Sequence, residues 1–171
     1  FPSWTETPDL AEATRVLRAA AQPNAGLLID VLHFARSRSS LEDLRELPRE
    51  WFHYAHVCDA PGRIPATTAG LIHTARFERL FPGEGEIDML AILDALPADI
   101  PFALEIPRAT LVAQVGAKEH ARLAISAARG HLDARPLRRS PGASRDDRTG
   151  GCQGEIRVGG RSVRARSQDG V

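Results

Sequence analysis

Three short apolar runs alternate with helical patterns over the first 132 residues, and this alternation restricts the fold more than any other feature. The runs cover 26–31, 51–58 and 100–106, and the helical patterns cover 7–21, 41–46, 88–96 and about 117–132. Hydroxyl groups of Thr7 and of Ser39–Ser40 predict the starts of the first two helices. A long connection covers 61–86. Strands that alternate with helices are typical of a parallel sheet covered by helices, so the sequence predicts an α/β fold.

Each apolar run is interrupted near its end by one ionisable residue: Asp30, His56 and Glu105. An ionised carboxylate among Leu, Ile and Val is costly unless it is paired, hydrogen-bonded or bound to a metal. The carboxyl ends of parallel strands meet at one edge, where catalytic groups collect in (β/α) barrels. A mixed set of oxygen and nitrogen ligands suits Mn²⁺, Mg²⁺, Co²⁺ or Zn²⁺. The three residues therefore predict a metal site, although each one alone could serve the core or anchor a loop.

Two further residues are candidates for contact with a substrate. His33 lies three residues beyond Asp30 and is expected in the loop after the strand, where it could equally be a surface histidine. Arg63 follows the second strand and could hold an anionic or hydroxylated substrate, or remain a solvated charge. The stretch 82–86 is expected to form a tight turn, because its two acids oppose the binding of a phosphate. His53, His73 and Cys58 are interpreted as structural.

Composition narrows the class of protein. Hydrophobic residues make up 43% and charged residues 26% of the chain, and the formal net charge is zero, so no overall field favours nucleic acid or a membrane. Cys58 and Cys152 are too far apart in sequence to predict a disulfide framework, which fits a cytoplasmic protein. No apolar run approaches the ~20 residues that span a bilayer, and no signal peptide is recognisable. The segment 134–171 contains nine Arg and seven Gly and is expected to be a disordered tail.

Four motifs follow one another along the chain: Asp30-x-x-His33, His56-Val-Cys-Asp59, Pro82-Gly83-Glu84-Gly85-Glu86-Ile87-Asp88 and Leu104-Glu105. Together they resemble the sugar phosphate isomerase/epimerase family of xylose isomerase-like TIM barrels, from about Phe1 to Leu132. The resemblance implies the last three to four βα units of a (β/α)8 TIM barrel, which covers 1–133. The first four to five strands would lie outside this chain. A chain that begins with Phe1 rather than Met permits a fragment or a processed product.

The resemblance also implies a site and a reaction. A divalent metal, often Mn²⁺, would be held by Asp30, His56, Glu105 and a second glutamate that this chain lacks. Glu105 would be catalytic, and His33 and Arg63 would contact the substrate. The implied activity is isomerisation or epimerisation of a small sugar or sugar phosphate, by proton transfer through an enediolate in which the metal acts as a Lewis acid.

Three alternatives remain open. A metal-dependent dehydratase or lyase on the same scaffold could act on a cyclic polyol or a dehydroshikimate-like acid, with Arg63 near the carboxylate. A nuclease of the apurinic-site class is less expected, because no basic groove is recognisable. The chain could also be an inactive fragment whose open sheet edge leads it to associate, for instance as a homo-oligomer.

Overall fold

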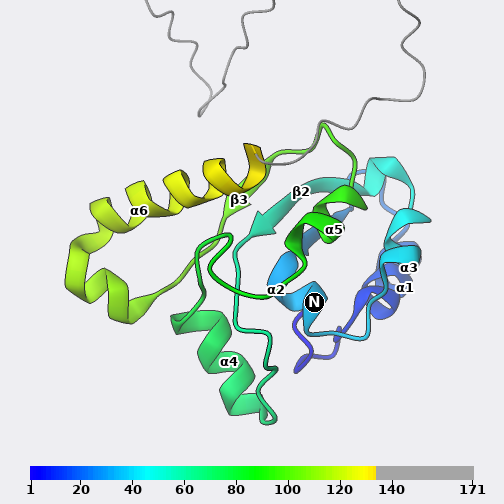
Figure 1. Cartoon of the computed structure of the whole chain (residues 1–171). Coiled ribbons are helices and arrows are strands. Elements are labelled where there is room, and N and C mark those ends of the chain that lie inside the picture. Colours follow the sequence, from blue (N-terminus) through cyan, green and yellow to red (C-terminus); the bar gives the residue numbers. More distant parts are fainter. Residues whose placement is uncertain (134–171) are drawn as a thin grey trace, which may run out of the picture. The chain divides into compact units, whose positions relative to one another are not determined.

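The computed structural model describes residues 1–133, and its three strands form one parallel sheet of order β1-β2-β3 (Figure 1). The elements are α1 (Leu10–Ala20), β1 (Leu27–Asp30), α2 (Val31–Ala35), α3 (Leu41–Arg45), the short 3₁₀ helix η1 (Arg49–Trp51), β2 (Phe52–Val57), α4 (Thr68–Phe77), α5 (Met89–Asp94), β3 (Phe102–Leu104) and α6 (Ala109–Asp133). The predicted parallel α/β class is confirmed. The expected disordered tail over 134–171 lies outside the described residues.

The register of the sheet aligns the ends of the three strands. Asp30 of β1 pairs with His56 of β2, and His56 pairs in turn with Ala103 of β3. Glu105 follows β3 directly, and its backbone N–H donates to the carbonyl oxygen of Val57 at 3.2 Å. The three ionisable residues that interrupt the apolar runs therefore end at the same edge of the sheet.

The two faces of the sheet differ, because side chains alternate between faces along each strand. Ile29 of β1 and Ala55 and Val57 of β2 are fully buried and form the centre of the core. Asp30 and His56 lie on the other face, together with Tyr54, whose ring meets that of His56 edge-on at 5.4 Å. Tyr54 remains 38% exposed, so this second face is the more open of the two.

Helix starts follow the local chemistry of the sequence. The Ser40 hydroxyl accepts from the N–H of Asp43 and caps α3, as predicted. At α1 the prediction was wrong by two residues, because the Asp9 carboxylate rather than Thr7 accepts from the N–H of Glu12 and caps the helix. An ionised side chain stabilises the positive end of the helix dipole as well as filling an open N–H.

Other helices lie where none was expected, or are longer than expected. The connection 61–86 contains α4, which the Thr67 hydroxyl caps. The α2 helix follows β1 without a loop, so His33 lies on a helix rather than in a loop. The α6 helix already begins at Ala109, and Gly116, with φ +80°, kinks it where the prediction placed its start. Among the described residues, no helix is long and apolar enough to cross a bilayer.

Candidate metal site

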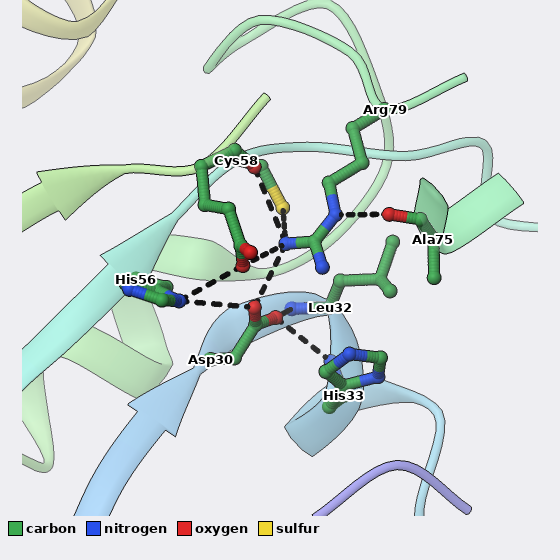
Figure 2. A network of polar contacts seen from close by, with 8 residues as sticks. Asp30, Leu32, His33, His56, Cys58, Ala75 and Arg79 are labelled. Atoms are coloured by element: carbon green, nitrogen blue, oxygen red, sulfur yellow. Dashed lines mark hydrogen bonds and ion pairs between the residues drawn. The ribbon is translucent and has the colours of Figure 1, made fainter. Parts of the chain in front are cut away.

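Asp30, His56 and Glu105 form a cluster at the carboxyl ends of the three strands. Nδ1 of His56 lies 2.8 Å from Oε2 of Glu105 and 3.6 Å from Oδ2 of Asp30 (Figure 2). Each residue offers one ligand atom, and these atoms all lie within 4.8 Å of one another. The structure therefore brings together the three residues that the sequence predicts as metal ligands.

Asp30 is held in place by the helix that follows it. Its Oδ1 accepts hydrogen bonds from the N–H groups of Leu32 at 3.0 Å and His33 at 3.2 Å, so Asp30 caps α2. The residue is only 4% exposed. With Oδ1 turned to the helix, Oδ2 is the oxygen that faces His56. This strand-to-helix turn explains why an aspartate can end an apolar strand.

Arg79 compensates the charge of Asp30, which sequence reasoning did not foresee. Nη1 of Arg79 donates to Asp30 Oδ2 at 2.8 Å and lies 3.1 Å from Glu105 Oε2. The arginine is only 3% exposed, and its Nε donates to the carbonyl oxygen of Ala75 at 2.8 Å. The buried aspartate was a signal that an ion-pair partner, a hydrogen-bond donor or a metal must be nearby. The connection 61–86 offers several arginines, however, and nothing in their spacing distinguishes Arg79.

The surroundings of the cluster shift the pKa values of two buried groups. Burial alone would raise the pKa of Asp30, but the Arg79 charge and hydrogen bonds to the carboxylate lower that pKa below its usual range. Asp30 is therefore ionised at neutral pH. Burial raises the pKa of the Cys58 thiol to about 12, although the nearby Arg79 guanidinium opposes this. Cys58 thus stays protonated, and its Sγ accepts from Arg79 Nη1 at 3.4 Å.

The two residues predicted to contact a substrate occupy different surroundings. His33 is half-buried on α2, with its ring edge-on to Trp4 at 5.3 Å. Burial lowers the pKa of His33 to about 4, against the opposing charge of Asp30, so its imidazole is neutral at neutral pH. Arg63 is exposed on the loop after β2. The contacts around Asp30 include Arg79 and not Arg63.

Asp59 anchors the loop that follows Arg79. Its buried carboxylate accepts from the N–H groups of Ala60, Gly83, Gly85 and Ile87 at 2.8–3.1 Å. Backbone hydrogen bonds of 2.9 Å in both directions also join Asp59 to Leu80, the residue after Arg79. The expected tight turn over 82–86 is confirmed, since the N–H of Glu84 donates to the carbonyl of Phe81 and Gly83 has φ +87°. These contacts tie Arg79 to the end of β2.

The donor set of the cluster fits a divalent cation. It consists of one imidazole nitrogen and two carboxylates, converging from adjacent strands, and hard to borderline cations such as Mn²⁺ or Zn²⁺ accept such ligands. The guanidinium of Arg79 already touches both carboxylates, and it shows that this place attracts positive charge.

Comparisons with known proteins show which proteins this chain resembles. No family model matches the sequence. A 3-dehydroshikimate dehydratase from Pseudomonas putida is 28% identical over 94 residues, which are 53% of this chain and 14% of the dehydratase. The crystal structure of the IolI protein with a bound zinc atom matches with a TM-score of 0.61 and 20% identity, over 74% of this chain and 44% of that one.

A fusion of a xylose isomerase-like TIM barrel with a 4-hydroxyphenylpyruvate dioxygenase also matches, with a TM-score of 0.52 and 27% identity, over 59% of this chain and 16% of that one. The chain thus spans less than half the length of each of these proteins. The predicted resemblance is confirmed: over part of its length, the chain has relatives among the xylose isomerase-like TIM barrels and shares their fold.

Proposed function

We propose that this chain contributes a divalent-metal site to a sugar or sugar phosphate isomerase or epimerase, which moves a proton on the carbon next to a carbonyl. The observation that supports it is the convergence of Asp30, His56 and Glu105 at one edge of a parallel sheet. Barrel enzymes carry out their chemistry at the carboxyl ends of their strands, and these three residues lie at such ends. The shared fold with the zinc-binding IolI structure supports the same proposal.

Mn²⁺ is the ion we propose for this site, with Mg²⁺, Co²⁺ and Zn²⁺ as substitutes. Two carboxylates and one imidazole suit all four ions, and the ligands present include no thiolate that would favour zinc. When bound, the metal supplies Lewis-acid stabilisation of the negative charge that develops on substrate oxygens.

Glu105 is the residue we assign to proton transfer. Its side chain is 45% exposed, whereas that of Asp30 is 5% exposed and tied to the α2 backbone. A group that removes a proton must reach the substrate, and only the more exposed carboxylate has that access. The neutral imidazole of His33 can exchange hydrogen bonds with a substrate hydroxyl, and Arg63 can approach from the loop after β2.

Dehydration is the second candidate, and the match to 3-dehydroshikimate dehydratase favours it. Loss of water from such an acid would begin with removal of a proton next to a carbonyl, which is the same first step. The substrate would carry a carboxylate, and Arg79 already contacts two carboxylates of the protein. A carboxylated substrate would therefore meet Arg63, the exposed arginine on the loop after β2, as a phosphorylated sugar also would.

Hydrogen exchange with solvent tests the proposal directly. The chain is loaded with Mn²⁺ in D₂O and incubated with ketohexoses, their phosphates and 3-dehydroshikimate, and deuterium at the α-carbon is followed by NMR. We expect incorporation into a sugar substrate, its loss in Glu105→Gln, and its retention in Glu46→Gln, which alters an exposed glutamate on the protein surface. Exchange that survives Glu105→Gln would disprove the assigned role.

The same experiment separates the two candidates. Dehydration of 3-dehydroshikimate would favour the dehydratase, whereas isomerisation or epimerisation of a ketose or a ketose phosphate would favour the isomerase. Absence of exchange with every substrate would overturn both.

A further inference from the structure

Arg79 contacts the same two carboxylate oxygens that the proposed metal would use. Its Nη1 lies 2.8 Å from Asp30 Oδ2 and 3.1 Å from Glu105 Oε2, and these are the oxygens that face His56 Nδ1. The other oxygen of Asp30 is already occupied by two N–H groups of α2. A metal at this site and Arg79 would therefore bind the same two carboxylate oxygens.

We propose that Arg79 competes with the divalent cation for Asp30 Oδ2 and Glu105 Oε2, so that this arginine sets the metal affinity of the site. In the metal-free chain Arg79 acts as the internal counter-cation of the two carboxylates. Glu105 would turn away from the guanidinium to hold a bound metal. This inference rests on the metal site of the proposed function.

The competition follows from charge and distance. A ligand oxygen lies about 2.1 Å from a bound Zn²⁺ or Mg²⁺. Since Nη1 lies 2.8 Å from the same Asp30 oxygen, the two cations would be separated by no more than about 5 Å. Like charges at that distance repel strongly where burial keeps water out, and Arg79 is only 3% exposed.

Glu105, rather than Arg79, is the partner that can move. Arg79 is fixed by its Nε bond to Ala75 and by Nη1 bonds to Cys58 and to the backbone oxygen of Glu105. The Glu105 side chain is 45% exposed, and its Oε2 lies 2.8 Å from His56 Nδ1 and 3.1 Å from Arg79 Nη1. Rotation of this carboxylate towards the metal therefore disturbs few contacts, whereas removal of the guanidinium would leave several buried acceptors unpaired.

The direction of the change in affinity separates competition from a purely structural role. If Arg79 only supports the ligands, its replacement loosens the cluster and weakens metal binding. If Arg79 competes, replacement by a neutral side chain tightens binding and at the same time destabilises the metal-free protein, because Asp30 loses its counter-charge.

The test is calorimetric titration of the whole chain with Mn²⁺. We expect Arg79→Gln to bind Mn²⁺ about tenfold or more tightly than wild type. Arg76→Gln removes the same charge from an exposed position on α4 and should leave the affinity unchanged. Arg79→Lys keeps the charge and should bind close to wild type. An Arg79→Gln affinity equal to or weaker than wild type would overturn the competition while leaving the metal site in place.

Thermal unfolding gives a second readout, which can be used even where the variant is less stable than wild type. Arg79→Gln should melt below wild type without metal and show the larger Mn²⁺-induced rise in Tm. If Arg79→Gln is unfolded without metal, added Mn²⁺ should restore its helical circular dichroism, and failure to do so would overturn the proposal. If neither wild type nor any variant binds Mn²⁺, the metal site of the proposed function fails, and the competition fails with it.

Discussion

The carboxylate of Asp59 accepts a hydrogen bond of 2.9 Å from the N–H of Gly85, 26 residues further along the chain. It accepts three more from Ala60, Gly83 and Ile87, so one buried side chain organises the whole loop 82–87. Only Phe81 separates this loop from Arg79 and Leu80. The position of the cluster's cation therefore depends on an aspartate that does not belong to the cluster.

Asp59→Asn should destabilise the protein by about 2–3 kcal/mol. The amide retains one acceptor oxygen, while its NH₂ group faces N–H donors of the loop that need an acceptor. Urea unfolding measures the loss. Glu46→Gln makes the same chemical change at an exposed site and should change the free energy of unfolding by less than about 0.5 kcal/mol. Equal stabilities of the Asp59 variant and wild type would contradict the anchoring role.

Replacement by alanine should have opposite effects on stability at two glycines. A Cβ at Gly85 would collide with the Asp59 carboxylate and the Ala60 carbonyl oxygen, so Gly85→Ala should cost about 1–3 kcal/mol by forcing the loop apart. A Cβ at Gly130 of α6 meets no atom within 4 Å, so Gly130→Ala should stabilise the helix by up to about 1 kcal/mol. Thermal melts of both variants test the pair, and a stabilising Gly85→Ala would refute the close approach.

The protonation of His33 should make stability depend on pH. Burial lowers the pKa of His33 from 6.5 to about 4, so between these values the unfolded chain binds a proton that the folded chain does not. Stability must therefore fall as pH decreases from 6.5 towards 4, by about 1–2 kcal/mol once partial exposure is allowed for. Urea unfolding at pH 4.5 and 7 measures this slope. His33→Asn should flatten the slope, and an equally steep slope in that variant would assign the effect elsewhere.

Addition of Mn²⁺ should raise the Tm of the wild-type chain, and EDTA should reverse the rise. A ligand at 100 times its Kd stabilises the folded state by about 2.7 kcal/mol. His56→Ala removes the single nitrogen ligand of the cluster and should abolish most of the shift. His73→Ala, which changes an exposed histidine on α4, should keep it. A shift of equal size in both variants would show that Mn²⁺ binds elsewhere.

Much of the fold could be predicted from local patterns. The Leu-Leu-Ile run before Asp30 indicated β1, and Ser40 correctly marked the start of α3. The α2 helix was missed because it follows β1 with no turn residue between them, so no boundary is visible in the sequence. The α4 helix was missed because the connection that contains it has no strongly apolar face, and because its cap is a single Thr67 hydroxyl.

The residues that converge at the strand ends were predictable, and their counter-ion was not. Asp30, His56 and Glu105 each interrupt an apolar run, so their residue types and their places near the ends of the runs identified them as candidates. Their assignment as metal ligands stays a prediction, as do the substrate roles of His33 and Arg63. Arg79 and Arg76 lie three residues apart in the same segment, yet one is buried against Asp30 and the other is exposed.

The sequence by itself determined the alternation of strands and helices and the chemistry at the end of each strand, because hydrophobic period and capping act over a few residues. Only the tertiary structure decided which cation forms the ion pair with the buried Asp30. That choice depends on the turn around Asp59, which joins residues more than 20 positions apart and turns Arg79, and no other arginine of its segment, towards the carboxylates. Such long-range packing decides whether a charge can be buried, because the free-energy cost of burial depends on the groups that surround the charge in space and not on its neighbours in sequence.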